Sequence, residues 1–436
     1  MNDNITATEL FDRIAQTARQ ADTSQAAKTL HDVLVLACTH GLRGSHHAFG
    51  SLMAQVDRLC RDRHLRAADQ VAIHKMRRDS NRTAEPLHTD DVAADCRALA
   101  LFVSAVFGEG IPHTLSSLLP HSTNTPQQAT EAYWPSIRCV IQAFDNDTLT
   151  VTVDNDLTPL PLVINYTNTP SYRDFTYLRR IFREGMQLNL IRCTVKEGTA
   201  TPQMIVVEPD FLIDISTLAA CFKDYGHHAL NYLVRRMMPS ANSQAILLGN
   251  FAGDVLDAII NSKQFDFNET LRTHFCQKAL EYATCTDTNL PALKQAMNLQ
   301  VENIKGMVDE LFQQFNREKA ILEPSFVCEQ LGVQGRVDLM TSDLRLLVEQ
   351  KSGKNIFIER DFNNEHGGRH IESHYVQVLL YYAVLQQNFG RQNDTRIHLM
   401  YSKYERERGL LEMKPLQALV EEAIKLRNQV VATEFF

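Results

Sequence analysis

The spacing of hydrophobic residues divides the chain into stretches with different expected secondary structure. Through residues 6–119, apolar side chains recur every three or four positions, most clearly in segments 30–36, 49–59 and 92–107. This is the period of an amphipathic helix, whose apolar stripe faces a core. We therefore expect a helical N-terminal domain over residues 1–120.

A second pattern begins after residues 121–130, a stretch rich in Ser, Thr, Asn, Pro and Gln that is typical of a linker. Apolar and polar residues then alternate, which is the period of a half-buried strand. Strands are expected at residues 137–141, 149–153, 160–166, 188–195 and 203–208. Short strands separated by turn residues predict a small β-barrel over residues 130–212. An oligonucleotide-binding barrel and a β-rich spacer both fit this pattern.

The C-terminal half first returns to the helical period, over residues 212–319, and then mixes strands with helices. Strand-like segments at 323–340, 344–350 and 397–401 alternate with helical segments at 374–385 and 415–431. This order predicts a mixed sheet flanked by helices. The expected fold class is therefore mixed α/β, with a third domain over residues 213–436 that carries a helical insertion near residues 258–320.

Composition limits the functions that this chain can have. The 436 residues include 44 Lys and Arg against 52 Asp and Glu, and the net charge of −8 excludes a basic protein that coats nucleic acid. A local basic groove would still suffice for a nucleic-acid enzyme. Nine scattered cysteines without a C-x-x-C pair, no signal peptide and no membrane-spanning run predict a cytoplasmic protein, nucleoid-associated if bacterial, with no membrane partner.

Three charged residues form the strongest candidate site. A glycine turn leads into residues 335–340, a predicted short strand that carries Asp338, and the next apolar strand ends in Glu349-Gln350-Lys351. Side chains alternate along a strand, so Glu349 and Lys351 point to the same face. If the two segments form a hairpin, Asp338 lies across from that pair. Each piece alone is common on solvated turns and strands, but the combination favours a site.

Two carboxylates beside an ammonium group suit metal-dependent hydrolysis of a phosphodiester. Mg²⁺ or Mn²⁺ takes oxygen ligands from one or two carboxylates, waters and the substrate phosphate. Lys351 can orient the attacking water or stabilise the charged transition state. A predicted helix adds His374, Gln377 and Tyr381, which lie one turn apart on one face, although a surface stripe is the alternative interpretation.

The order of these motifs resembles the RecB-type branch of the PD-(D/E)XK nuclease superfamily. The likeness covers residues 321–404 and rests on Gly335-Arg336-Val337-Asp338, Glu349-Gln350-Lys351 and, most specifically, Gln377-x-x-x-Tyr381. It implies a restriction-endonuclease-like core in which Asp338 and Glu349 hold the metal and Lys351 serves the water. It also implies that Gln377 and Tyr381 lie against the active centre.

The sequence departs from the family pattern upstream of this core. Family members carry a histidine there in a G-x-x-x-H pattern, but here the place falls on Gly253 or Asp257, depending on the alignment. Asp257 is a candidate replacement as an oxygen ligand, and an acidic residue on a solvated helix face is the alternative. No cysteine follows Cys328, so no iron–sulfur cluster is expected. Residues 351–355 lack the spacing of a phosphate loop, so no ATP site is expected in this chain.

The wider order of a helical region, a barrel and this nuclease-like region resembles the N-terminal half of large helicase-nucleases of replication and repair. It implies a superfamily 1 helicase as partner, in the same chain if this is a fragment and otherwise in another. Single-stranded or flapped DNA is the substrate class implied by the family and the possible barrel. A catalytically weak DNA-binding scaffold, favoured by the missing histidine, and a defence-type endonuclease remain as alternatives.

Two segments that mix basic and aromatic residues are candidates for binding DNA. The first holds Arg179, Arg180 and Arg183 with Phe175, Tyr177 and Phe182, and the second holds Lys403, Arg406 and Arg408 with Tyr401 and Tyr404. An ordinary amphipathic segment is the alternative for each. Glu323, on the first predicted strand of the core, and His374 are expected to support the site.

Overall fold

The computed structural model describes residues 5–20, 22–43, 51–81, 89–120, 131–153, 161–167, 174–223, 226–239, 242–262, 264–360, 370–390 and 394–435. The chain divides into two compact units, Met1–Asp210 and Phe211–Phe436. The predicted linker at residues 121–130 lies outside the described residues. Within those residues, no helix is both long and apolar enough to cross a membrane.

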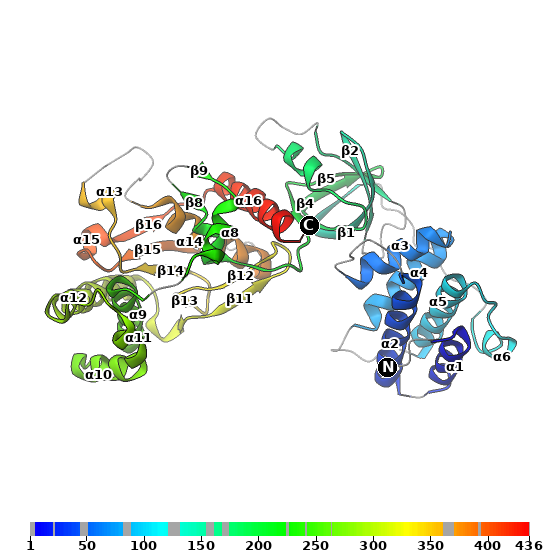
Figure 1. Ribbon diagram of the computed structural model, residues 1–436, viewed down its shortest axis with the longest axis horizontal. Coiled ribbons are helices and arrows are strands. Elements are labelled where there is room, and N and C mark those ends of the chain that lie inside the picture. The colour runs from blue at the N-terminus through cyan, green and yellow to red at the C-terminus, as the bar shows by residue number, and fades with distance from the viewer. Residues whose placement is uncertain are drawn as a thin grey trace. The chain divides into compact units, whose positions relative to one another are not determined.

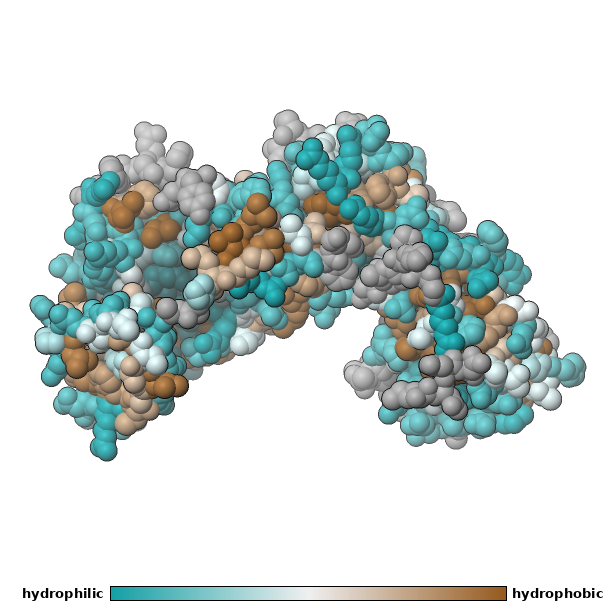
Figure 2. All heavy atoms as spheres, in the orientation of Figure 1, coloured by the Kyte–Doolittle hydropathy of each residue, from teal (hydrophilic) through white to brown (hydrophobic). Residues whose placement is uncertain are grey.

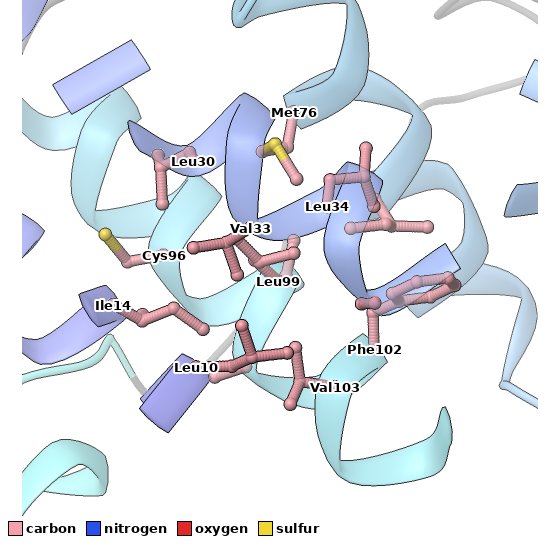
Figure 3. Packing of buried hydrophobic residues seen from close by; sticks show 14 of the residues in the cluster. Leu10, Ile14, Leu30, Val33, Leu34, Met76, Cys96, Leu99, Phe102 and Val103 are labelled. Carbon is pink, nitrogen blue, oxygen red and sulfur yellow. The ribbon is translucent and has the colours of Figure 1, made fainter. Parts of the chain in front are cut away.

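Helices form the first part of the N-terminal unit, as the hydrophobic period predicted (Figure 1). They are α1 (Ala7–Thr17), α2 (Thr23–Gly41), α3 (Leu52–Asp62), α4 (Ala67–Asp79), α5 (Thr89–Phe107) and α6 (His113–Ser116). Thr6 and Glu9 form a reciprocal capping box that starts α1, and Asp22 caps α2. The apolar faces meet in one core, where Leu10 of α1 and Phe102 of α5 are fully buried (Figure 3).

A closed five-stranded barrel follows in the same unit. Its elements are β1 (Glu131–Phe144), β2 (Thr148–Val153), β3 (Leu162–Asn165), the 3-10 turn η1 (Thr176–Arg180), β4 (Gln187–Lys196), β5 (Thr199–Thr201) and β6 (Met204–Val207). The strand order is β1-β2-β3-β5-β4, and β4 pairs again with β1, which closes the ring, while β6 extends the sheet along β4. The predicted barrel is therefore confirmed, and only the short β5 was missed.

The C-terminal unit alternates helices and strands. Its helical elements are α7 (Ile215–Ala219), α8 (Leu230–Met237), α9 (Gln244–Asn261), α10 (Phe267–Gln277), α11 (Ala279–Thr284), α12 (Leu290–Gln314), η2 (Arg317–Lys319), α13 (Ile356–Glu359), α14 (Glu372–Phe389), α15 (Arg406–Gly409) and α16 (Gln417–Phe435). Its strands are β7 (Ile213–Asp214), β8 (Phe222–Lys223), β9 (Gly226–His227), β10 (Ala320–Leu322), β11 (Ser325–Cys328), β12 (Val333–Arg336), β13 (Leu339–Thr341), β14 (Leu346–Lys351), β15 (Arg396–Tyr401) and β16 (Leu410–Met413).

A mixed five-stranded sheet organises this unit, as the element order predicted. The order is β10-β13-β14-β15-β16; β14 and β15 run parallel, and the other neighbours run antiparallel. A parallel pair needs a long crossover, which contains α14. Helices α9 and α12 share a core with Leu346 and Val348 of β14. Helix α12, which makes up much of the range predicted as an insertion, thus packs on the sheet itself.

The chain around Asp338 differs from the single strand predicted over residues 335–340. Strand β12 ends before Asp338 and β13 begins after it, and the two strands belong to different sheets. Opposite the break lie Glu323, whose φ is +49°, and Pro324, which has no N–H to donate to a ladder. Asp338 therefore lies at a bend between two sheets, because the paired ribbon cannot continue straight through these residues.

Helix α8 exposes most of its apolar residues. Leu230, Val234, Met237 and the following Met238 are 53%, 54%, 82% and 65% exposed, and hydrophobic side chains gather over this helix in Figure 2. Asn231 of α8 holds the helix in place by donating to the Cys221 carbonyl at 3.1 Å.

Candidate active site

The candidate site is built at the C-terminal end of β14, where the strand's alternation separates three consecutive side chains. Lys351 Nζ donates to Glu349 Oε1 at 2.8 Å, so these two residues share a face. The side chain of Gln350 points to α9 instead, where its Nε2 donates to the Ala252 carbonyl at 3.1 Å. The predicted convergence of Glu349 and Lys351 on one face is confirmed.

Asp338 lies across from this pair, as the hairpin prediction required. Strands β13 and β14 are antiparallel, and continuing their register by one residue places Asp338 opposite Glu349. The backbone N–H of Gln350 donates to Asp338 Oδ2 at 2.5 Å, so the carboxylate takes the place of a ladder carbonyl. Burial raises the pKa of Asp338, while the Gln350 N–H and the Lys351 ammonium lower it.

Gln377 of α14 joins the two charged residues of β14. Its Nε2 donates to Glu349 Oε1 at 2.7 Å, and its Oε1 accepts from Lys351 Nζ at 2.9 Å. Gln377 is 7% exposed, and an amide this buried needs both partners. The sequence expectation that this glutamine meets the site, rather than solvent, is confirmed.

The carboxylate of Glu349 is buried at 3% exposure and only half satisfied. Oε1 accepts from Lys351 and Gln377, but Oε2 has no hydrogen-bond partner among the described residues. Burial first, and the charge of Asp338 second, raise the pKa of Glu349 to about 8, against the lowering effect of Lys351. An orphaned carboxylate oxygen in such a place fits a cation, which would supply its missing partner.

Tyr381, one turn after Gln377, is a supporting residue. It is 1% exposed, and its hydroxyl donates to the Arg336 carbonyl at 2.7 Å, beside Asp338. A Cβ at Gly335 would lie 3.0 Å from the Tyr381 ring and hydroxyl, so the glycine makes room for the tyrosine. The glycine of one motif and the tyrosine of the other are thus in direct contact.

His374, one turn before Gln377, is tied to the end of β15. Its Nδ1 lies 3.0 Å from the Tyr401 hydroxyl, and the Ile371 N–H donates to the same hydroxyl at 3.1 Å. Burial and then the Lys351 charge lower the pKa of His374 to about 3, so the ring is neutral near pH 7.

Asp257 is coupled to the site by charge. Burial first, and then the charges of Glu323, Asp254 and Asp338, together raise its pKa to about 6. Within the described parts of the chain, no three His, Cys, Asp or Glu side chains form a group that could hold a metal ion. Asp338 and Glu349 lie opposite each other in the register, and two carboxylates are a usual protein contribution to a Mg²⁺ site. Asp254 instead accepts from His274 Nδ1 at 2.6 Å.

The three remaining candidates lie in surface ion pairs. Glu323 follows β10 rather than lying on a strand, and it pairs with Arg336 at 2.9 Å. Lys403 pairs with Glu359 at 2.8 Å. Arg406 pairs with Glu310 and Glu407. Both predicted DNA-binding cations are therefore already neutralised by carboxylates, which weakens any patch that they could form.

Three of the five aromatic residues in the predicted DNA-binding segments are buried, whereas Tyr177 and Tyr404 are half-buried. Phe175, Phe182 and Tyr401 are 7%, 0% and 0% exposed, so their faces cannot stack on bases. The reason is that Phe182, which follows η1, packs against Phe144 of β1 and Tyr166, and that Tyr401 lies on the central strand β15. Arg179 and Arg180 remain exposed.

Asp214, which caps α7, is a residue that the motif search missed. Its charge raises the pKa of Glu349 and contributes to the raised pKa of Tyr381. Ser402, whose hydroxyl accepts from Gln350 Nε2 at 3.3 Å, lies on the other face of β14, towards α9. The capping pattern Asp214-x-x-Thr217 was visible in the sequence, but nothing in it indicated that β7 pairs with β12 next to the site.

No protein-family model matches this chain, and no curated protein matches it.

Proposed function

We propose that this protein hydrolyses phosphodiester bonds in DNA with Mg²⁺ or Mn²⁺ held by Asp338 and Glu349. The observation that carries the proposal is the Glu349 carboxylate, which is buried beside Asp338 with one oxygen clamped and the other without a partner. A metal bound there would polarise the phosphodiester and neutralise developing charge.

Lys351 has a donor left for the substrate. An ammonium group carries three N–H donors, and its described partners, Glu349 and Gln377, take two of them. The third can bind the attacking water or a phosphate oxygen, where a fixed positive charge stabilises the transition state. Gln377 holds the ammonium in place, which agrees with the position against the active centre that the resemblance to RecB-type nucleases implies for it.

The substrate class that we propose is single-stranded or flapped DNA. The closed barrel supports it, because its order β1-β2-β3-β5-β4 with η1 between β3 and β4 is similar to that of oligonucleotide-binding barrels. Tyr133 on β1 is 57% exposed and offers an aromatic face for a base. A superfamily 1 helicase, in the same or another chain, is the partner proposed to supply the unwound strand.

A second function, a DNA-binding scaffold of low activity, is favoured by one observation. The described residues offer two converging carboxylates but no group of three metal-binding side chains. In that case DNA would bind and stay intact.

Cleavage of labelled single-stranded, flapped and duplex DNA with Mg²⁺ or Mn²⁺ tests the proposal. Wild type, Lys351→Ala and the control Lys319→Ala are compared, because Lys319 forms a similar pair with Asp343 at 3.0 Å elsewhere in the unit. We expect metal-dependent cutting by wild type and Lys319→Ala, and none by Lys351→Ala. Folded wild type that binds DNA without cutting it would establish the scaffold instead.

A further inference from the structure

His374 stands at the start of the polar row of α14 that faces the end of β14. Gln377, which contacts Glu349 and Lys351, follows three residues later. Residues at this spacing share a helix face. Tyr401, whose hydroxyl lies 3.0 Å from His374 Nδ1, pairs in register with Lys351 across β14 and β15, so the side chains of Tyr401 and Lys351 point to the same face of the sheet. Unlike Gln377, His374 is only partly buried.

The hydrogen bonds around Tyr401 determine which ring nitrogen of His374 carries the proton. The Ile371 N–H can only donate, and it donates to the Tyr401 oxygen at 3.1 Å. The Asn355 side chain also hydrogen-bonds to this oxygen and lowers its pKa. With its oxygen accepting from both, the Tyr401 O–H donates to His374 Nδ1 at 3.0 Å. A neutral ring that accepts at Nδ1 carries its hydrogen on Nε2.

This arrangement leaves His374 one fixed donor, the Nε2–H, on the helix face that carries Gln377 to the ammonium of Lys351. An uncharged donor next to a cation suits an anionic oxygen, because both can contact it without adding a second buried charge. The Nδ1 side cannot bind a ligand, since Tyr401 occupies it.

We propose that the Nε2–H of His374 donates to a non-bridging oxygen of the DNA phosphate that lies beside Lys351. This inference rests on the proposed function and deepens it, because it assigns a residue that orients the substrate's backbone. No bond forms or breaks at His374, and its ring stays neutral throughout.

Two substitutions separate this role from a structural one. The amide of His374→Gln reaches the position of Nε2 and keeps a donor there, whereas that of His374→Asn reaches only the position of Nδ1 and keeps the contact with Tyr401. Cleavage rates with Mn²⁺, the Kd for a single-stranded oligonucleotide in chelator and the melting temperature are measured for both. Loss of a hydrogen bond to a charged oxygen predicts about a ten- to hundredfold fall in kcat/KM for His374→Asn, with near wild-type activity for His374→Gln.

The reverse order, with His374→Asn active and His374→Gln impaired, would overturn the inference and make the Tyr401 contact the function of this residue. Equal activity of both variants with wild type would overturn it as well, while leaving the nuclease proposal intact. If wild type binds DNA without cutting it, the nuclease proposal fails, but the phosphate contact can still be tested by binding. Weaker DNA binding by His374→Asn than by His374→Gln would then support the contact. The slope of log Kd against log salt should stay unchanged, since a neutral donor releases no counterion.

Discussion

The helical region and the C-terminal sheet both bury carboxylates, but they partner them differently. In the helices, Asp57, Asp69 and Asp79 each pair with a basic residue three or four positions away on the same chain segment: Arg61, Arg66 and Lys75. In the sheet, Asp338 lies at the bend before β13, opposite Glu349 of β14, and Glu349 accepts from Gln377 of a distant helix. Helix geometry alone creates the first kind of pair. The second exists only once the sheet has formed, and it brings a second carboxylate, that of Asp338, opposite Glu349 and its unpartnered oxygen.

The largest expected difference between the two regions is in catalysis. Glu349→Gln removes a metal-binding oxygen but keeps an amide that Lys351 and Gln377 can contact. We expect at least about a thousandfold slower cleavage, since a metal contributes several kcal/mol to such reactions. The melting temperature should change little. Asp57→Asn, at an equally buried carboxylate, should cleave at the wild-type rate, and a matching loss in that variant would remove the distinction.

A smaller loss of activity is expected when the clamp is removed and the carboxylates are kept. Gln377→Leu frees both Glu349 and Lys351. Partners that orient metal ligands are worth about ten- to hundredfold in metal affinity or activity. Rates measured across a Mn²⁺ titration should show this loss. Gln377→Glu should not recover activity, because it adds a negative charge next to Glu349. Unchanged rates in the leucine variant would show that the clamp does not serve the site.

Breaking an ion pair of the helical region should lower the stability of the protein and leave cleavage unchanged. Arg61→Ala removes the charged partner of Asp57 at 3.2 Å and leaves this buried carboxylate only its neutral partners Thr152 and Gln142. Loss of a charged hydrogen-bond partner predicts a loss of about 1–2 kcal/mol in the free energy of unfolding. Urea denaturation measures it, and cleavage per folded molecule should stay at the wild-type value. A fall in specific activity would contradict a purely structural role for this pair.

The buried Asp95 of α5 should make the stability of the N-terminal unit depend on pH. Burial raises its pKa to about 7, against the lowering effect of Lys75. This folded-state pKa exceeds the unfolded value near 4. The protonated Asp95 carboxyl therefore makes its full contribution to stability below pH 4, and this contribution is lost as the pH rises toward 7. The melting temperature of Asp95→Asn should therefore be about 2–4 °C above that of wild type at pH 8. At pH 4 the two proteins should melt at the same temperature. An equal shift at both pH values would point to packing instead.

The smallest effect is expected at the paired surface cations. Lys403 and Arg406 each pair with a carboxylate, so replacing both with Ala exposes as much negative charge as it removes positive charge. The slope of log Kd against log salt for DNA binding should change by less than about one. A change of two in this slope would indicate that Lys403 and Arg406 do contact phosphates.

Much of the fold followed from the sequence, because periodicity reports which faces are buried. The alternation in residues 346–351 predicted the shared face of Glu349 and Lys351, and the helical spacing predicted that Gln377 and Tyr381 share a face. Both inferences needed only local geometry, whereas the position of that helix face against the site was implied by the resemblance. The burial of Tyr401 was not predictable in this way, since it depends on β15 lying between β14 and β16.

The contacts that the site makes outside its motif could not be predicted from the sequence either. Asp214 reaches Glu349 only because β7 pairs with β12 across more than a hundred residues of chain. The bend at Asp338 arises from Glu323 and Pro324 on the opposing strand, which a single-strand pattern does not contain. Local patterns thus identified the residues of the site, whereas the sheet determined what surrounds them.

Binding of Mn²⁺ tests most directly whether converging carboxylates, and not locally paired ones, form the functional centre. Calorimetry is carried out on wild type, Asp338→Asn, Glu349→Gln and Asp57→Asn, each with and without a single-stranded oligonucleotide. The account predicts binding in wild type and Asp57→Asn, and its loss in Asp338→Asn and Glu349→Gln. No binding by folded wild type in the presence of DNA, or equal binding by all four proteins, would contradict it.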